Sequence, residues 1–463
     1  MQKVHLVDKE DIKDVSEVKR ALEWCALIPG IQEKMKENPE ETIKELGLNL
    51  VPEDISFCPR DNDKDLHMKA LHPGTKAEKY ANFVNNKFDY IDIIREACIP
   101  TNEAMKKWRD RQINRCKVDI GGHTAMLIHA PLLIEIADGC SIGCEFCGLN
   151  AGRLKSVFRY TEENAKLFNE VISACKEVIG DAAGHGTMYF ASEPMDNPDY
   201  ELFNRDYVKT FGVIPQITTA ASTRHIERLR KLVAELDEDC GTIHRFSITS
   251  EKMAREIFDA FTPEELIFVE LLPQYEEAPS NNFVKVGRHA DGDSDSDYAD
   301  TISCLSGFKV NMCRKDIALS TPTWSTKEHP TGEIILEVRN FTDGDDFKKV
   351  LKEMISKHMM NIIKPNDEIT MADGLTYTET EDGDIIFTNN KEVEVKLRTN
   401  GGDSKKLNLE IFNILSSGYN TKREVVAKLN EKIEGAALGS DLIFFAINRY
   451  WNMGLIKTKS GTI

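Results

Sequence analysis

The feature that most constrains the fold is an alternation of short apolar runs with longer amphipathic stretches between residues 131 and 272. The apolar runs have the length of buried strands and lie at 131–137, 187–191, 213–219, 242–248 and 267–272. The stretches between them have helical spacing and lie at 162–179, 224–236 and 250–261. Repeated strand–helix units predict an α/β fold in which helices cover a parallel sheet, either an open sheet or a barrel.

Different patterns flank this alternation and predict three domains, at 1–120, 121–364 and 365–463. The first is acidic and helical, with breakers at Pro29-Gly30, Pro39 and Gly47. The second ends with strands at 308–312 and 317–320 and a helix at 347–358, after a polar insertion at 274–303 whose acidic run at 291–297 is typical of a solvated loop. The third contains strands at 368–371, 376–380, 385–388 and 393–397, expected to form antiparallel hairpins, and helices at 409–416, 422–429 and 441–452.

Composition disfavours several classes of function. The chain carries 59 Lys and Arg against 77 Asp and Glu, a net charge of −18, and would repel nucleic-acid phosphate. A membrane span needs about 20 apolar residues, and the most apolar stretch of the chain, 125–137, is shorter than that. The first residues are acidic and lack the apolar core of a signal peptide, and the eleven cysteines are an odd number. We therefore expect a cytoplasmic protein with reduced thiols that binds neither nucleic acid nor membrane.

The most specific chemical signal is the cysteine triplet Cys140, Cys144 and Cys147, which follows the first predicted strand. Spacings of four and three can bring three thiolates to three corners of one [4Fe–4S] cubane. Such a cluster normally takes four thiolates, so a triplet leaves one iron open to a substrate or cofactor. A zinc site would need a fourth ligand, which the loop lacks, and the third possibility is three buried thiols.

This CxxxCxxC motif, with Phe146 before its third cysteine, resembles that of the radical S-adenosylmethionine (SAM) enzymes. The resemblance implies a partial (β/α)6 barrel, one [4Fe–4S] cluster and SAM as cofactors. It also implies an external electron donor of the flavodoxin or ferredoxin type. In that family, reductive cleavage of SAM on the cluster gives a 5′-deoxyadenosyl radical, and the protein orients and shields the reaction.

The same resemblance suggests SAM contacts in this chain. The segment Ala191-Ser192-Glu193-Pro194 resembles the family's Gly-Gly-Glu-Pro motif, which holds the SAM ammonium, although Ala-Ser replaces the two glycines. Ser247, at the end of the predicted strand 242–248, matches the position that touches the ribose or the carboxylate of SAM. Thr219 and Arg245 are further candidates; for all of these, an ordinary polar strand end is the alternative.

The C-terminal region follows a winged-helix plan of strands, helix, turn, helix, helix and strand. Its third helix, at 441–452, carries Arg449 as its single basic residue and many apolar ones, which makes it a poor reader of DNA bases. The region instead resembles the precursor-peptide recognition domains of enzymes that mature ribosomal peptides. Those domains bind a leader peptide as an added strand against their third strand and third helix. From 401 to 463, nine Lys and Arg outnumber six Asp and Glu, which would favour an acidic leader.

Two further features narrow the resemblance. Residues 34–55 resemble the nitrile-hydratase-type leaders of proteusin precursors, although an acidic helical pair packed on the barrel is the alternative. No cysteine follows Cys313, which argues against a second cluster in the C-terminal region and against the thioether-forming maturases that need one. Together these features resemble the proteusin-type radical SAM peptide epimerases, whose partner is a precursor peptide with a nitrile-hydratase-type leader.

In those epimerases the radical removes the Cα hydrogen of an L-residue, and a cysteine thiol on the opposite face returns a hydrogen atom. Cys313, which follows the strand 308–312, is the preferred candidate for this donor, and Cys304 is the alternative. The remaining cysteines are expected to be structural, and they are Cys25, Cys58, Cys98, Cys116, Cys175 and Cys240.

Two other functions stay open at this point. The first is a different radical SAM modification of a peptide, such as crosslinking or methylation. The second is an iron–sulfur regulator that binds DNA through its winged helix, which would show steeply salt-dependent binding to duplex DNA.

Overall fold

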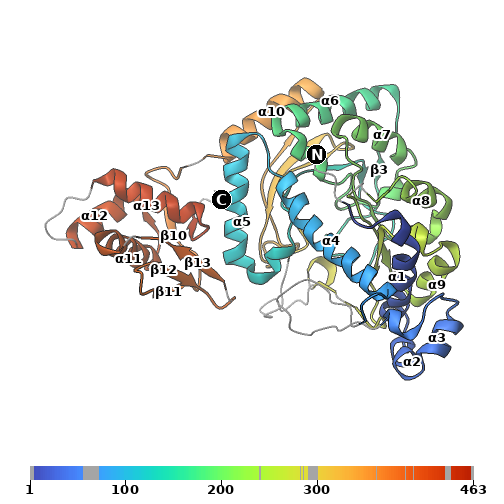
Figure 1. The fold of residues 1–463 in the computed structure, drawn as a ribbon. Helices are drawn as coiled ribbons and strands as arrows, with labels where there is room; N and C mark the ends of the chain where they lie inside the picture. Colours follow the sequence, from blue (N-terminus) through green and yellow to red (C-terminus); the bar gives the residue numbers. More distant parts are fainter. Residues whose placement is uncertain are drawn as a thin grey trace.

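A computed structural model describes residues 5–55, 72–238, 241–281, 283–284, 286–289, 301–360, 362–391, 393–399, 401–432 and 439–459. The acidic run 291–297, Cys58 and Cys240 lie outside these residues. The described chain combines helices with parallel and antiparallel sheets, so the predicted α/β class is confirmed. Figure 1 shows a large α/β body and a smaller C-terminal unit beside helix α5.

The N-terminal region is helical, as predicted. Its α-helices are α1 (Ile12–Leu27), α2 (Ile31–Glu37), α3 (Pro39–Glu45), α4 (Lys76–Ala97) and α5 (Glu103–Ile120). Helix α1 is tied to the body by the buried ammonium of Lys19, which donates hydrogen bonds to the carbonyls of Leu266 and Val269 at 3.0 and 2.7 Å. Figure 1 shows α2 and α3, which contain half of the leader-like segment, at the end of the body away from the C-terminal unit.

Two sheets form the centre of the body. The first has the order β1-β7-β8-β9, in which β1 (Ala130–Glu135) and β7 (Leu305–Asn311) are parallel, and β8 (Asp316–Pro322) and β9 (Glu333–Asn340) continue antiparallel. The second sheet contains the parallel strands β4 (Thr218–Thr219), β5 (His244–Ile248) and β6 (Val269–Pro273). The strand β9 was not predicted from the sequence.

The segment after residue 186 connects the two sheets. The N–H of Ile134 in β1 donates to the Thr187 carbonyl at 2.9 Å, and Thr187 forms a parallel bridge with Gln216. The prediction of a regular strand at 187–191 is therefore wrong, because the segment makes one bridge and then bends. Gly186 permits this contact, since a Cβ there would lie 1.7 Å from the Leu132 carbonyl oxygen.

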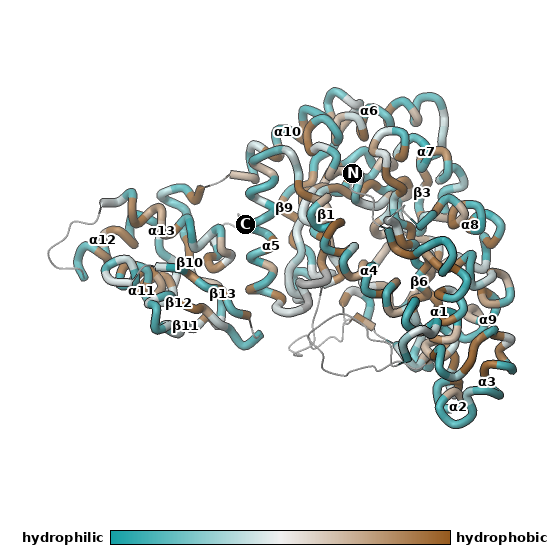
Figure 2. Tube along the Cα trace, in the orientation of Figure 1, coloured by the Kyte–Doolittle hydropathy of each residue, from teal (hydrophilic) through white to brown (hydrophobic). Residues whose placement is uncertain are grey.

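Strand alternation gives these sheets two different faces. On one face, Leu132, Phe246 and Phe308 join the main apolar core under the outer helices, and Figure 2 shows the apolar strands surrounded by more polar helices. Intervening positions such as Arg245 and Lys309 are polar. The helices are α6 (Glu162–Ile179), α7 (Tyr200–Phe211), α8 (Ile226–Val233), α9 (Glu251–Ala260) and α10 (Gly344–His358).

The C-terminal unit has its own apolar core, which includes Phe387, Ile411 and Ile447. One sheet contains β11 (Thr376–Glu379), β12 (Ile385–Thr388) and β13 (Glu394–Leu397), followed in the chain by α11 (Gly402–Ser416), α12 (Lys422–Lys432) and α13 (Ser440–Asn452). The expectation that β10 (Glu368–Met371) belongs to the hairpins is wrong. It pairs with β14 (Asn420–Thr421) and β15 (Ile456–Thr458), which lets Ile369 and Met371 pack in the core.

Helix α5 contacts both the C-terminal unit and the body. The guanidinium of Arg111 lies 3.7 Å from the ring centroid of Trp451, and the Asn114 side chain donates to the Asn452 carbonyl at 2.8 Å. On its other side, Cys116 donates to the Pro322 carbonyl at the end of β8. Helix α13, the third helix of the predicted recognition domain, therefore ends against α5, which in turn contacts the central sheet.

Candidate functional site

The three cysteines lie on one loop, residues 139–155, which we call the cysteine loop. It runs between β2 (Ala137–Asp138) and β3 (Ser156–Val157), whose antiparallel pairing brings its two ends together. At this base the Cys140 N–H donates to the Gly152 carbonyl at 2.9 Å. Gly139 has φ +88°, and a Cβ there would lie 2.2 Å from the Arg153 carbonyl oxygen, so the closed base requires glycine.

The thiols of the cysteine loop are partly exposed. Burial raises the pKa of Cys144 to about 11, and the neighbouring Cys140 and Cys147 contribute to this rise. The sulfur of Cys140 accepts the N–H of Ile142 at 3.4 Å, and that of Cys147 accepts the N–H of Ala151 at 3.4 Å. Such N–H groups stabilise the thiolate form that binds metal.

The donor set fits an iron–sulfur cubane by type and number. Among the residues that the structure describes, no group of three or more His, Cys, Asp or Glu is arranged to hold a single metal ion. A cubane differs from a zinc site because its thiolates bind separate iron atoms rather than one shared ion. Three partly exposed thiols on one loop, with N–H donors to two of them, are suited to that group.

Two of the predicted SAM contacts, Glu193 and Thr219, meet beside the cysteine loop. The Glu193 carboxylate accepts hydrogen bonds from the Thr219 hydroxyl at 2.5 Å and from the N–H groups of Ala220 and Met195 at 3.0 and 3.1 Å. Burial raises the pKa of Glu193, against the lowering effect of these three donors. The carboxylate also contributes to the raised pKa of Cys140, which places it close to the loop.

The other candidates are more scattered. Arg245, on β5, donates to the Glu270 carboxylate at 3.1 Å and keeps 48% of its side chain exposed. Ser192 and Ser247 are half-buried, and the structure gives neither a hydrogen bond to Glu193. Phe146 stacks on Phe283 with ring centroids 5.6 Å apart. The structure therefore brings Glu193 and Thr219 together and leaves Arg245 with Glu270.

The two candidate donor cysteines have different surroundings. The thiol of Cys313, just after β7, lies 3.7 Å from the Ser156 carbonyl, beside the base of the cysteine loop. Cys304 comes directly before β7, and its carbonyl accepts the Ala130 N–H at 2.9 Å. Its thiol lies near Arg245 and contributes to the pKa of Tyr189, which burial raises to about 12. Burial raises the pKa of both thiols, so both are protonated at neutral pH.

The remaining described cysteines fit a structural role. Cys98, Cys116 and Cys175 are buried, and burial raises the pKa of each thiol, to about 12 for Cys98 and about 11 for Cys116. Cys25 is half-buried on α1 and its pKa is also raised by burial. All described cysteines are free thiols.

The sequence did not indicate that a second segment, which contains Gly287 and Arg288, contacts the cysteine loop. The guanidinium of Arg288 donates to the Cys144 carbonyl at 2.7 Å and to the Ala151 carbonyl. The backbone N–H of Arg288 donates to the Cys147 carbonyl at 3.0 Å. Gly287 has φ +63°, and a Cβ there would lie 2.3 Å from the Gly148 carbonyl oxygen. The only sequence signal for this contact is a Gly-Arg pair inside a polar insertion. Such a pair is too common to predict a contact.

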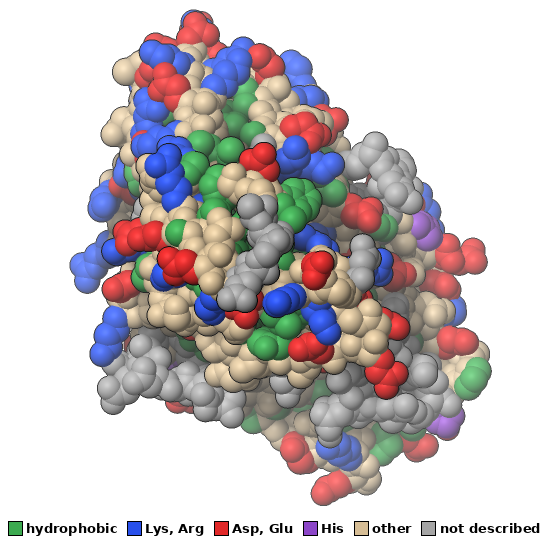
Figure 3. All heavy atoms as spheres, turned by 90° about the vertical axis from the view of Figure 1, so that its left-hand side faces the viewer, with side chains coloured by type: hydrophobic (Ala, Val, Ile, Leu, Met, Phe, Trp, Pro, Cys, Tyr) green, Lys and Arg blue, Asp and Glu red, His purple; other side chains and the backbone are tan. Residues whose placement is uncertain are grey.

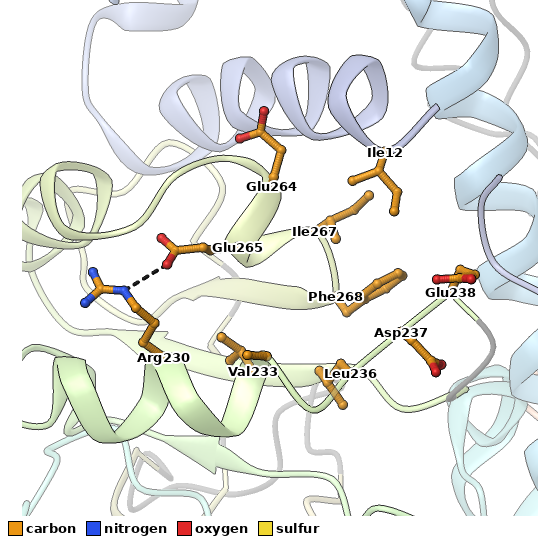
Figure 4. Close-up of a pocket in the computed structure, with 11 residues that line it drawn as sticks. Ile12, Arg230, Val233, Leu236, Asp237, Glu238, Glu264, Glu265, Ile267 and Phe268 are labelled. Carbon is orange, nitrogen blue, oxygen red and sulfur yellow. Dashed lines mark hydrogen bonds and ion pairs between the residues drawn. The ribbon is translucent and has the colours of Figure 1, made fainter. Parts of the chain in front are cut away.

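A cavity of about 240 Å³ lies elsewhere, between α1, α8 and residues 264–268. Figure 4 shows its apolar lining, which includes Ile12 and Phe268, and the ion pair of Arg230 with Glu265 at 2.8 Å. None of the predicted site residues lines it. Since no cysteine lines the cavity, the cysteine loop is the better candidate for the site.

The described helices include none that is both long enough and apolar enough to cross a membrane.

Comparison with known proteins gives one informative similarity. The chain is similar to the uncharacterized protein y4wI of Sinorhizobium fredii, with 31% identity over 395 residues. The match covers 82% of this chain and 76% of that protein. No family model matches the chain, and no solved structure matches it.

Proposed function

The chain belongs to the same family as the Sinorhizobium fredii protein y4wI, and from its own residues we propose that it is a radical SAM peptide epimerase. The observation that carries the proposal is the closed loop on which Cys140, Cys144 and Cys147 lie together beside the Glu193 carboxylate. The substrate class is a ribosomally made precursor peptide of the proteusin type.

In this proposal the three cysteines hold the [4Fe–4S] cluster, and Glu193 with Thr219 forms the edge that receives the SAM ammonium. The cluster and SAM together supply a 5′-deoxyadenosyl radical that removes a Cα hydrogen from the peptide. The fold that this assignment requires is a partial (β/α)6 barrel. The parallel strands β7, β1, β4, β5 and β6, linked through Thr187, support that reading.

Both oxygens of Glu193 already accept protein hydrogen bonds, so the carboxylate is held in one orientation. A carboxylate fixed by three donors can attract an ammonium through its remaining lone pairs without reorganising. The half-buried Ser192 precedes it, and Ser247 on β5 provides a hydroxyl for the ribose or the carboxylate of SAM.

The structure supplies an argument for Cys304 as hydrogen donor that the sequence lacked. The donor must be a protonated thiol on the far side of the peptide from the radical. Cys304 lies by the polar side chains of Arg245 and Tyr189, and burial keeps its thiol neutral. Cys313 lies instead at the base of the cysteine loop, on the same side as the cluster ligands. We therefore place Cys304 first and retain Cys313 as the alternative.

The C-terminal unit is proposed to bind the leader peptide. Leu442 and Phe445 on α13 are 51% and 68% exposed, although both are large apolar side chains. The same helix face continues to Arg449, which donates to the Arg398 carbonyl next to β13 at 3.0 Å. In its described part, β13 pairs only with β12, so its other edge is free to receive an added strand. Figure 3 shows apolar side chains gathered on the side of the molecule where this unit lies.

Changing Phe445 to Glu is expected to weaken binding of a labelled leader peptide by about tenfold or more. The change removes an exposed aromatic anchor and adds a charge that repels an acidic leader. Fluorescence anisotropy measures the dissociation constant. Tyr419→Glu is the matched control, because Tyr419 is 50% exposed but precedes β14 in the other sheet. Equal weakening by both variants, or by neither, would contradict the assignment of α13.

The proposed reaction is tested by incubating the reduced, cluster-loaded protein anaerobically with SAM and a candidate precursor. We expect 5′-deoxyadenosine together with D-residues in the hydrolysed peptide. A new crosslink or methyl group without D-residues would replace epimerisation by another radical SAM modification.

A further inference from the structure

An exposed basic strip forms the last part of the cysteine loop. Residues 152–156 are all exposed and contain Arg153, Leu154 and Lys155. The strip is hydrogen-bonded directly to a cysteine, because the Leu154 N–H donates to the Cys140 carbonyl at 3.1 Å and Arg153 forms a bridge with Cys140. It is therefore an exposed surface in direct backbone contact with a proposed cluster ligand.

The charges of this surface are only partly paired. No ion pair involves Arg153 among the described residues, and Lys155 is 72% exposed with its Nζ 3.6 Å from Asp138. The exposed Arg288 donates to the backbone carbonyls of Cys144 and Ala151. Within the cysteine loop, Glu145 is the acidic residue. The loop and Arg288 together carry three basic side chains against this one acidic side chain, whereas the net charge of the whole chain is −18.

We propose that Arg153, Lys155 and Arg288 form the docking surface for an acidic protein that donates single electrons. This inference rests on the proposed function, since cleavage of SAM consumes one electron per event. The donor protein loses one electron and the cluster gains it, without transfer of a proton or a group. Opposite charges on the two proteins accelerate their encounter, and Leu154, which is 36% exposed, provides a small apolar centre for contact.

An acidic leader peptide is a different occupant with the same sign of charge. The observations favour the electron donor because the strip contacts Cys140 itself, whereas the proposed leader surface lies on α13 and β13 of the C-terminal unit. An electron donor must approach the cluster closely, while a leader peptide needs to approach only the recognition unit.

The test compares the double variant Arg153→Glu/Lys155→Glu with a control of equal net charge, Lys166→Glu/Lys252→Glu. The control lysines are 77% and 86% exposed and lie on α6 and α9. Stopped-flow absorbance records reduction of the oxidised, cluster-loaded protein by reduced flavodoxin at low salt, and surface plasmon resonance gives the dissociation constant. Dithionite, a small reductant that needs no docking surface, serves as the second reductant for each protein.

We expect the double variant to accept electrons from flavodoxin about tenfold more slowly and to bind it correspondingly more weakly, with unchanged reduction by dithionite. Parent-like rates with flavodoxin, or equal slowing in the control, would overturn the docking surface. Unchanged flavodoxin rates with weaker precursor binding would assign the strip to the peptide instead. If dithionite produces no cluster spectrum change even in the parent protein, the proposed function itself fails.

Discussion

Replacing Cys144 by alanine is expected to abolish cluster binding and to reduce cleavage of SAM by more than about a hundredfold. The protein would hold the cubane by three thiolates, so removal of one thiolate removes a third of the bonds between protein and cluster. Iron and sulfide content, visible absorbance and 5′-deoxyadenosine formation are the measurements. The closed base of the loop depends on backbone contacts of Gly139 and Cys140, so the loop itself should persist in this variant.

Cys25→Ala is the matched control for this experiment, because Cys25 is a half-buried free thiol on α1. It should keep a full complement of iron and normal SAM cleavage. Near-normal iron and cleavage in Cys144→Ala would contradict the cluster assignment and, with it, the radical chemistry.

The second large effect concerns the hydrogen donor. A Cys304→Ala protein should keep its cluster and form 5′-deoxyadenosine, because neither step uses this thiol. The yield of D-residues should fall by more than about a hundredfold, since the peptide radical then lacks the hydrogen atom that converts it to the D-form. Chiral amino-acid analysis of the peptide and quantification of 5′-deoxyadenosine in the same reaction separate these two steps.

Cys313→Ala tests the alternative in the same assay. If Cys304 is the donor, this variant inverts its substrate at close to the parent rate. The reverse pattern would return the role to Cys313, as the sequence alone favoured. Full inversion by both single variants and by the double variant would exclude a cysteine donor in this protein.

Local patterns were predicted well because short-range physics determines them. The strands around residues 130–135, 244–248 and 269–273 and the order of elements in the C-terminal unit appear where hydrophobic periodicity indicated. The cysteine spacing is likewise local, since a short loop closed at its base holds all three thiols.

Long-range contacts could not be predicted in this way. The path of residues 187–191 depends on the close approach of Gly186 to β1, and the pairing of β10 depends on strands that begin at Asn420 and Ile456. The contact of Arg288 with the cysteine loop joins residues 144 positions apart in the sequence. Such contacts follow from tertiary packing, which overrides local propensity.

The candidate site shows the same division. Sequence resemblance pointed to Glu193 and Thr219 separately, and the hydrogen bond between them supports treating them as one unit. The pairing of Arg245 with Glu270 was not foreseeable, because it depends on the register of β5 and β6. The order of the two donor candidates also depends on side-chain surroundings that no periodicity encodes.

The most direct test of the central claim is the hydrogen at Cα after reaction of the precursor in D2O. A cysteine thiol exchanges its hydrogen with solvent, so our account predicts D-residues that each carry one deuterium at Cα, detected by mass spectrometry of the separated enantiomers. Cleavage of SAM with a peptide that retains L-residues and unlabelled Cα positions would contradict the account.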